Sequence, residues 1–138
     1  MSKLMIRWQE VAAADAQLLR LGRHCNLQLC WQVDNDPWFF IVESGRLLRI
    51  ERGPFHLRHS DLFFSASRSA WQKFFQSMPP RGFHDILAMS SYFHLQISGN
   101  QALLREHLAF LKQLMQIPRQ VDGDVLLAAD FSADGDTP

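Results

Sequence analysis

The middle of the chain alternates apolar and polar side chains between short turn signals, and this pattern constrains the fold more than any other feature. Residues 27–33 carry apolar side chains at odd positions and mostly polar ones at even positions, which is typical of a half-buried strand. Trp38–Glu43 and Arg46–Arg52 follow as two further strands. The turns between them, residues 34–37 and Ser44-Gly45, are short enough for hairpins. We therefore predict an antiparallel meander.

Two more strands are expected later in the chain. The segment His59–Ala66 follows the break at Gly53-Pro54, and we predict that it continues the meander. The last strand is Phe93–Ile97, where Phe93, Leu95 and Ile97 share one face because side chains alternate along a strand. The sheet is therefore expected to have five strands.

Apolar residues at three- and four-residue spacing predict helices before, between and after these strands along the chain. Asp15 and Asn100 are suitable N-cap residues, and Trp71, Phe74 and Phe75 form an apolar stripe on one predicted helix. The expected helices are residues 4–24 in two pieces, a helix from Ser69, a short helix over Asp85–Met89 and the longest helix over residues 101–117. The predicted fold class is α+β, with an antiparallel-rich sheet covered by helices and a long closing C-terminal helix.

Composition limits the classes of function. A length of 138 residues suits one domain with its own core. Eleven Phe and four Trp, against a single Tyr, imply a large core or an apolar cavity. Fourteen basic residues balance fourteen acidic ones, which argues against nucleic-acid binding. The longest apolar runs, Trp38–Val42 and Val125–Ala129, are far shorter than the ~20 residues of a transmembrane helix, so we expect no transmembrane segment.

The two cysteines and the N-terminus indicate the compartment. Cys25 and Cys30 lie five residues apart on what is predicted as one strand, so their side chains should point to opposite faces and form no disulfide. Two free thiols suit a reducing environment. The first ten residues lack the continuous apolar segment of a secretory signal. We therefore expect a cytoplasmic protein.

The C-terminal part differs in composition from the rest. After Arg119 there is no basic residue, whereas five aspartates follow. We therefore divide the chain into a domain over residues 1–118 and an acidic, flexible tail over residues 119–138. The apolar patch Val125–Phe131 is the exception, and we expect it to dock.

Six histidines raise the question of a metal or catalytic site. His56 and His59 are the closest pair, but their spacing puts them on opposite faces of an extended chain, and no further ligand completes a set. We expect no metal and no other cofactor. His24-Cys25 lacks the surroundings of an activated nucleophile, and His84-Asp85 is predicted to begin a helix. His107 is predicted to pack beside the apolar stripe of the closing helix, with contact to a ligand head group as the alternative.

Four segments resemble the sterol carrier protein 2 (SCP2) family, over about residues 15–117. Ser60–Ala66 is similar to the family's Asp-led apolar strand that ends in Ser-Ala, and the Trp71 helix follows it as in the family. Phe93–Asn100 resembles the last strand, which usually closes in Gly-Asp, so Asn100 is a departure. Asn also caps helices. Pro79–Leu87 is similar to a bacterial branch of small stand-alone members.

This resemblance implies an apolar tunnel between sheet and helices for fatty acyl or sterol-like ligands, and no catalytic residues. The partner it implies is a hydrophobic small molecule, which is carried or presented to a partner enzyme. The side chains expected to line the tunnel are Trp31, Trp38, Phe40, Phe93, Leu95 and Ile97 from the sheet, and Leu104, Leu108 and Leu111 from the closing helix.

Two alternatives stay open at this point. One is an α+β domain of the NTF2-like kind, whose cavity often holds an Asp/His pair, although such a domain would end in long curved strands. The other is an interaction subunit with a solid core, because the side chains of an apolar cavity and of a packed core are of the same type.

Overall fold

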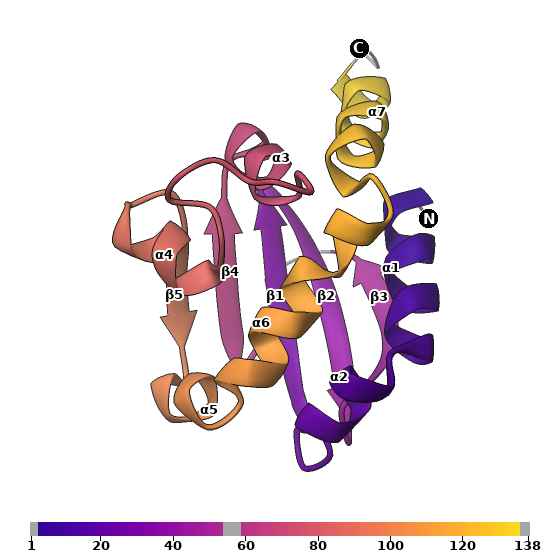
Figure 1. The fold of residues 1–138 in the computed structure, drawn as a ribbon, viewed down its shortest axis with the longest axis vertical. Helices are drawn as coiled ribbons and strands as arrows, with labels where there is room; N and C mark the ends of the chain where they lie inside the picture. The colour runs from indigo at the N-terminus through magenta and orange to yellow at the C-terminus, as the bar shows by residue number, and fades with distance from the viewer. Residues whose placement is uncertain (1–2, 54–58, 136–138) are drawn as a thin grey trace.

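The computed structural model describes residues 3–53 and 59–135, with side chains described up to residue 129. One sheet lies behind a layer of helices, and the last helix extends beyond one end of the sheet, next to the start of the first helix (Figure 1). The architecture is α+β, as the sequence predicts. In the described part of the chain, no helix is long and apolar enough to cross a membrane.

Most of the expected elements are present close to their expected positions. The strands are β1 (Leu27–Val33), β2 (Asp36–Glu43), β3 (Arg46–Arg52), β4 (Leu62–Ala66) and β5 (Gln96–Gly99). The helices are α1 (Lys3–Ala14), α2 (Ala16–Leu21), α3 (Arg68–Phe74), α4 (Ile86–Ser91), α5 (Gln101–Glu106), α6 (Leu108–Gln116), the 3₁₀ turn η2 (Ile117–Gln120) and α7 (Gly123–Gly135).

The five strands lie in the order β3-β2-β1-β4-β5. β1, β2 and β3 form the predicted antiparallel hairpins, and β5 is antiparallel to β4. β4 does not continue the meander, because it pairs in parallel with β1 instead of lying beside β3. The meander prediction is therefore wrong for this strand. A pairing between segments this far apart depends on the packing of the whole sheet rather than on local turn residues.

The N-terminal helices cover the edge of the sheet. Helix α1 packs along β3 and against α7. Its buried face consists of Leu4, Met5, Trp8 and Ala12. This three- and four-residue spacing gives one apolar stripe. Helix α2 begins at the N-cap Asp15, whose carboxylate accepts a hydrogen bond from the backbone N–H of Leu18, as predicted.

The closing helix differs from the prediction of one continuous helix over residues 101–117. It is two helices, α5 and α6, which meet at His107. His107 has φ −112° and ψ 25°, which lies outside the helical region. The predicted cap is confirmed, because the side chain of Asn100 accepts hydrogen bonds from the backbone N–H groups of Ala102 and Leu103.

The acidic C-terminal segment is helical over most of its described length. Residues 123–135 form α7, which packs against α3 and α1. Leu127 is fully buried in the core, whereas Val125 on the same helix is 62% exposed. We attribute the helix to packing of its apolar residues against α1 and α3. The aspartates in the same segment do not prevent the helix from forming.

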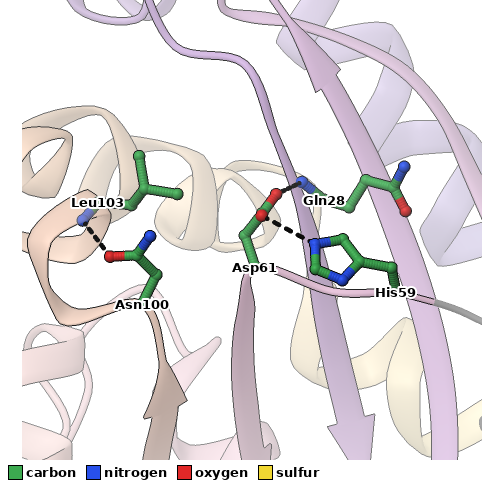
Figure 2. Close-up of polar contacts among 5 residues, drawn as sticks. All are labelled: Gln28, His59, Asp61, Asn100 and Leu103. Atoms are coloured by element: carbon green, nitrogen blue, oxygen red, sulfur yellow. Dashed lines mark hydrogen bonds and ion pairs between the residues drawn. The ribbon is translucent and has the colours of Figure 1, made fainter.

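Asp61 joins three segments at one end of the sheet (Figure 2). Its carboxylate accepts a 2.8 Å hydrogen bond from the backbone N–H of Gln28, and it lies 3.1 Å from Nε2 of His59. Its backbone carbonyl accepts a 2.8 Å hydrogen bond from the N–H of Asn100, whose side chain caps α5 at Leu103. The start of β4 is thereby tied to β1 and to the start of the closing helices.

Candidate ligand-binding interior

The sheet positions the first three predicted site residues on its helix-facing side. Trp31 on β1 lies directly opposite Trp38 on β2, and Leu29 lies opposite Phe40. Trp31 and Phe40 are 0% exposed and Trp38 is 5% exposed, and all three belong to the central core. The two-residue alternation of the strands therefore gives the correct face for these residues.

The next three predicted residues lie near the start of β5, and one of them is misplaced by the prediction. Leu95 is buried and Ile97 is partly buried against the core. Phe93 is 95% exposed and has a positive φ of 65°. Its backbone N–H donates to the carbonyl of Ser90, which closes the end of α4. Phe93 thus belongs to a helix-ending turn, whereas β5 begins only at Gln96, so the prediction of Phe93 in the interior is wrong.

The three leucines of the closing helices lie on both sides of the break at His107. Leu104 on α5 and Leu111 on α6 are buried in the core. Leu108, the first residue of α6, is half-buried and packs against the core from its edge. The side chain of His107 is 9% exposed and its Nε2 lies 3.9 Å from a carboxylate oxygen of Glu106.

An aromatic cluster fills the space between the sheet and the helices. The ring centroids of Trp8 and Trp31 are 5.3 Å apart, those of Trp8 and Phe40 4.8 Å, and those of Trp31 and Trp71 5.4 Å. Phe75 stacks on Trp71 at 5.7 Å. Edge-to-face and offset contacts of this kind stabilise aromatic pairs beyond the area they bury.

Trp8, Trp71 and Phe75 complete this cluster and lie outside the predicted set of tunnel residues. Trp71 and Phe75 belong to the apolar helical stripe that the sequence predicts, but they are not among the nine predicted tunnel residues. Trp8 has the spacing of a buried helix face with Leu4 and Met5. No sequence pattern shows that this face meets the two tryptophans of the sheet, because the contact joins segments far apart in the chain.

The pockets described for this structure open at the surface. One pocket of about 580 Å³ opens on the surface between the end of α2 and the β2–β3 turn, and its lining includes Arg20, Arg23 and Arg46. Other surface pockets have volumes of about 510, 410 and 260 Å³. None of these four pockets is lined by any of the nine predicted tunnel residues.

The side chains considered for catalysis or metal binding make contacts that belong to the fold itself. Asp85 begins α4 as its N-cap by accepting from the N–H of Ala88, as predicted. His59 contacts Asp61, whereas His56 lies outside the described residues. Among the side chains that the structure describes, no group of three or more His, Cys, Asp or Glu residues could hold a metal ion.

Both cysteines are free and fully buried. Cys25 belongs to the helix-facing core, whereas Cys30 lies opposite Phe39 on the other face of the sheet. Burial raises the pKa of the Cys25 thiol from 9.0 to about 12, with smaller contributions from Glu106 and Asp61, and burial raises the pKa of Cys30 to about 11. The thiolate is the reactive form of cysteine, so this environment does not activate Cys25.

We therefore expect both thiols to react slowly with a thiol reagent at pH 8 in native buffer and rapidly in urea. The raised pKa values also mean that the unfolded chain ionises first as the pH rises. The two thiols therefore contribute fully to the stability of the fold below about pH 9. This contribution decreases as the pH rises toward their pKa values in the folded protein, about 11 and about 12. Timed labelling followed by mass spectrometry measures the rates, and rapid native labelling of Cys25 would contradict its burial.

Comparison with solved structures identifies the fold. No protein-family profile and no curated protein matches the sequence. A crystal structure of sterol carrier protein 2 matches with a TM-score of 0.70 at 12% identity, over 86% of this chain and 95% of that one. A Thermus thermophilus protein, described as a candidate sterol carrier protein, matches with a TM-score of 0.68 at 12% identity, over 88% and 87% of the two chains.

A third solved structure is that of UbiJ-SCP2, a ubiquinone synthesis protein, with a TM-score of 0.52 at 9% identity, over 80% of this chain and 90% of that one. The chain therefore has the SCP2 fold, which confirms the fold expected from the sequence resemblance. The SCP2 fold excludes the alternative of an NTF2-like fold.

Proposed function

We propose that this protein binds a hydrophobic small molecule between its sheet and its helices, and that it carries or presents this molecule without changing it chemically. The observation that carries the proposal is the SCP2 fold, which extends over most of this chain and of its structural neighbours. The predicted site residues other than Phe93 lie in the apolar core or pack against it, which supports this proposal.

The composition of the interior supports an apolar ligand. Among the described residues, the buried side chains are aromatic, aliphatic or sulfur-containing, and Ser60 is the single buried polar one. Contact with such a lining stabilises a ligand by roughly 25 cal/mol per Å² of apolar area removed from water. No nucleophile or general base lies among the nine predicted tunnel residues, so binding rather than chemistry is what they can perform.

A ligand can enter only if the packed interior opens. We place the opening at the closing helices, because α5 and α6 meet at the non-helical residue His107 and the adjacent Leu108 is only half-buried. A helix pair with a break can move as two short segments, and ligand entry then requires local rearrangement rather than unfolding.

Fatty acyl chains and sterol-like molecules are the first ligands to test. The UbiJ neighbour is named for ubiquinone synthesis, so an isoprenoid quinone is a further candidate. A carrier of any of these would deliver its ligand to a partner enzyme, which we propose as the second partner.

Displacement of a fluorescent fatty acid tests the proposal directly. We expect the probe to bind with micromolar or tighter affinity and to be displaced by at least one acyl, sterol or quinone ligand. The second candidate function, an interaction subunit with a solid core, is favoured by the close packing of the aromatic cluster. Absence of binding by every apolar ligand tested would establish the solid core and exclude the carrier function.

Substitution of Leu108 tests the closing helices as the wall of the binding site. We expect Leu108→Trp to fold with a loss of about 1–3 kcal/mol from overpacking, and to bind the fluorescent fatty acid about tenfold or more weakly because the indole occupies ligand space. Ala109→Trp is the matched control, because Ala109 is the neighbouring residue and is exposed. Equal binding by the two variants would exclude Leu108 from the site.

A further inference from the structure

The four tryptophans differ in how their indole N–H groups are satisfied. The indole of Trp8 donates to the carbonyl of Leu114 at 2.9 Å, and that of Trp71 donates to the carbonyl of Gln32 at 2.9 Å. The indole nitrogens of Trp31 and Trp38 are completely buried and have no hydrogen-bond acceptor among the described residues. Buried indole N–H groups usually find a partner, so two unpaired ones form an exception that requires an explanation.

The two residues that carry these unpaired donors are cross-strand neighbours. Trp31 and Trp38 are directly opposite on β1 and β2, and both side chains are on the helix-facing side of the sheet. Trp31 belongs to the aromatic cluster, whereas Trp38 lies toward the edge strand, where the guanidinium of Arg52 is 5.3 Å from its ring centroid. Together they extend from the centre of the interior toward the surface.

Packing alone does not account for tryptophan at these positions. Phenylalanine provides the same kind of ring contact, as Phe40 does beside Trp31, and it buries no donor. An unpaired buried donor costs free energy, because the group has lost its hydrogen bond to water. Two unpaired donors on neighbouring residues of the proposed ligand site therefore indicate that a ligand atom is their acceptor.

We propose that Trp31 and Trp38 donate hydrogen bonds to an acceptor oxygen of the bound ligand. This inference rests on the proposed function and specifies its ligand class. The ligand is a long apolar molecule with an uncharged carbonyl, ester, quinone or ether oxygen within it or at its end. The oxygen is uncharged because no buried cation accompanies these donors in the described core. The nearby Arg52 already pairs with Asp36 at 2.8 Å.

The indole N–H resonances of ¹⁵N-labelled protein test this directly. Four tryptophans give four indole signals, which Trp→Phe variants assign. The probes are methyl hexadecanoate, which has acceptor oxygens, and hexadecane, which has none. We expect the ester to shift the Trp31 and Trp38 indole protons downfield, as a new hydrogen bond does, and to leave those of Trp8 and Trp71 in place. Hexadecane should produce no downfield shift.

Conservative variants separate this role from packing. Trp31→Phe and Trp38→Phe should each reduce the affinity for methyl hexadecanoate by about tenfold and leave that for hexadecane unchanged. Each replacement leaves a small void that lowers the melting temperature, but the fall for the ligand-free Trp31→Phe and Trp38→Phe variants should be smaller than that for Trp71→Phe, because neither of them loses a hydrogen bond. Trp71→Phe is the control, and its melting temperature should fall because its hydrogen bond to Gln32 is lost.

The outcomes distinguish this inference from the function beneath it. If ester and hexadecane bind the parent and both variants equally, the acceptor oxygen is excluded and the carrier function stands. If neither probe binds the parent protein, the carrier function and this inference both fail. A fall in melting temperature for Trp31→Phe and Trp38→Phe as large as that for Trp71→Phe would show that the two indoles have acceptors within the protein, which also overturns the inference.

Discussion

Gly99→Ala is expected to destabilise the protein by about 2–5 kcal/mol, the sum of a strained backbone conformation and a steric overlap. Gly99 ends β5 with a φ of +106°, which side-chain-bearing residues rarely adopt. A Cβ atom at this position would lie 2.3 Å from the backbone carbonyl oxygen of Asp61 and 3.0 Å from Cα of Leu62. Both atoms belong to the backbone at the start of the neighbouring strand β4, so neither can move without disturbing the sheet.

The location of Gly99 increases the effect. The next residue, Asn100, donates its backbone N–H to the same Asp61 carbonyl and caps α5 with its side chain. Displacing Gly99 therefore disturbs the junction of β4, β5 and the closing helices that Figure 2 shows. Ser98→Ala is the control, because Ser98 is exposed on the same strand and its loss should change stability by less than about 0.5 kcal/mol. Urea unfolding of both variants measures the difference, and equal midpoints would contradict this account.

The parts of the fold that follow from the sequence are those with local causes. The turn residues at Ser44-Gly45 give the β2–β3 hairpin, and Asp15, Asp85 and Asn100 begin the helices that they were expected to cap. Each of these signals acts within a few residues of its own position. The expected face of β1 and β2 is correct for the same reason, since alternation is a property of a single strand.

The parts that sequence analysis missed depend on distant contacts. The parallel pairing of β4 with β1 has no turn signal between the two strands. Helix α7 forms although its composition is acidic, because α1 and α3 offer its apolar residues a surface. Phe93 fits the alternation of a strand, but its backbone N–H donates a hydrogen bond to the carbonyl of Ser90 at the end of α4, which places it in a turn. In each case tertiary packing determines the local conformation.

The candidate site also has a part that the sequence predicts and a part that only the folded chain shows. Aromatic content and alternation predict an apolar interior containing Trp31, Trp38 and Phe40. Whether an indole N–H has an acceptor depends on which carbonyl lies beside it. For Trp8 that carbonyl belongs to Leu114, which is 106 residues away. The difference between paired and unpaired tryptophans is therefore visible only in the folded chain, and it is this difference that specifies a ligand class.

Phe75→Ala is expected to cost about 3–5 kcal/mol of stability. The Phe75 side chain is 0% exposed, and its ring centroid lies 5.5 Å from Trp8, 6.0 Å from Trp31 and 5.7 Å from Trp71. Removing the ring loses its transfer free energy and leaves a void, because three large rings cannot all move into the space. Phe93→Ala makes the same chemical change at a 95% exposed position and should change stability by less than about 0.5 kcal/mol.

The same pair of variants also tests whether the interior accepts a ligand. The void left by Phe75→Ala is lined by apolar rings, so an apolar ligand that reaches the interior can fill it and stabilise the folded state by mass action. We expect methyl hexadecanoate to raise the melting temperature of Phe75→Ala more than that of the parent or of Phe93→Ala. Thermal unfolding with and without the ester measures this. If Phe75→Ala loses less than about 1 kcal/mol, Phe75 is not part of a close-packed cluster. If it is destabilised as expected but the ester restores nothing, the interior is closed to ligands.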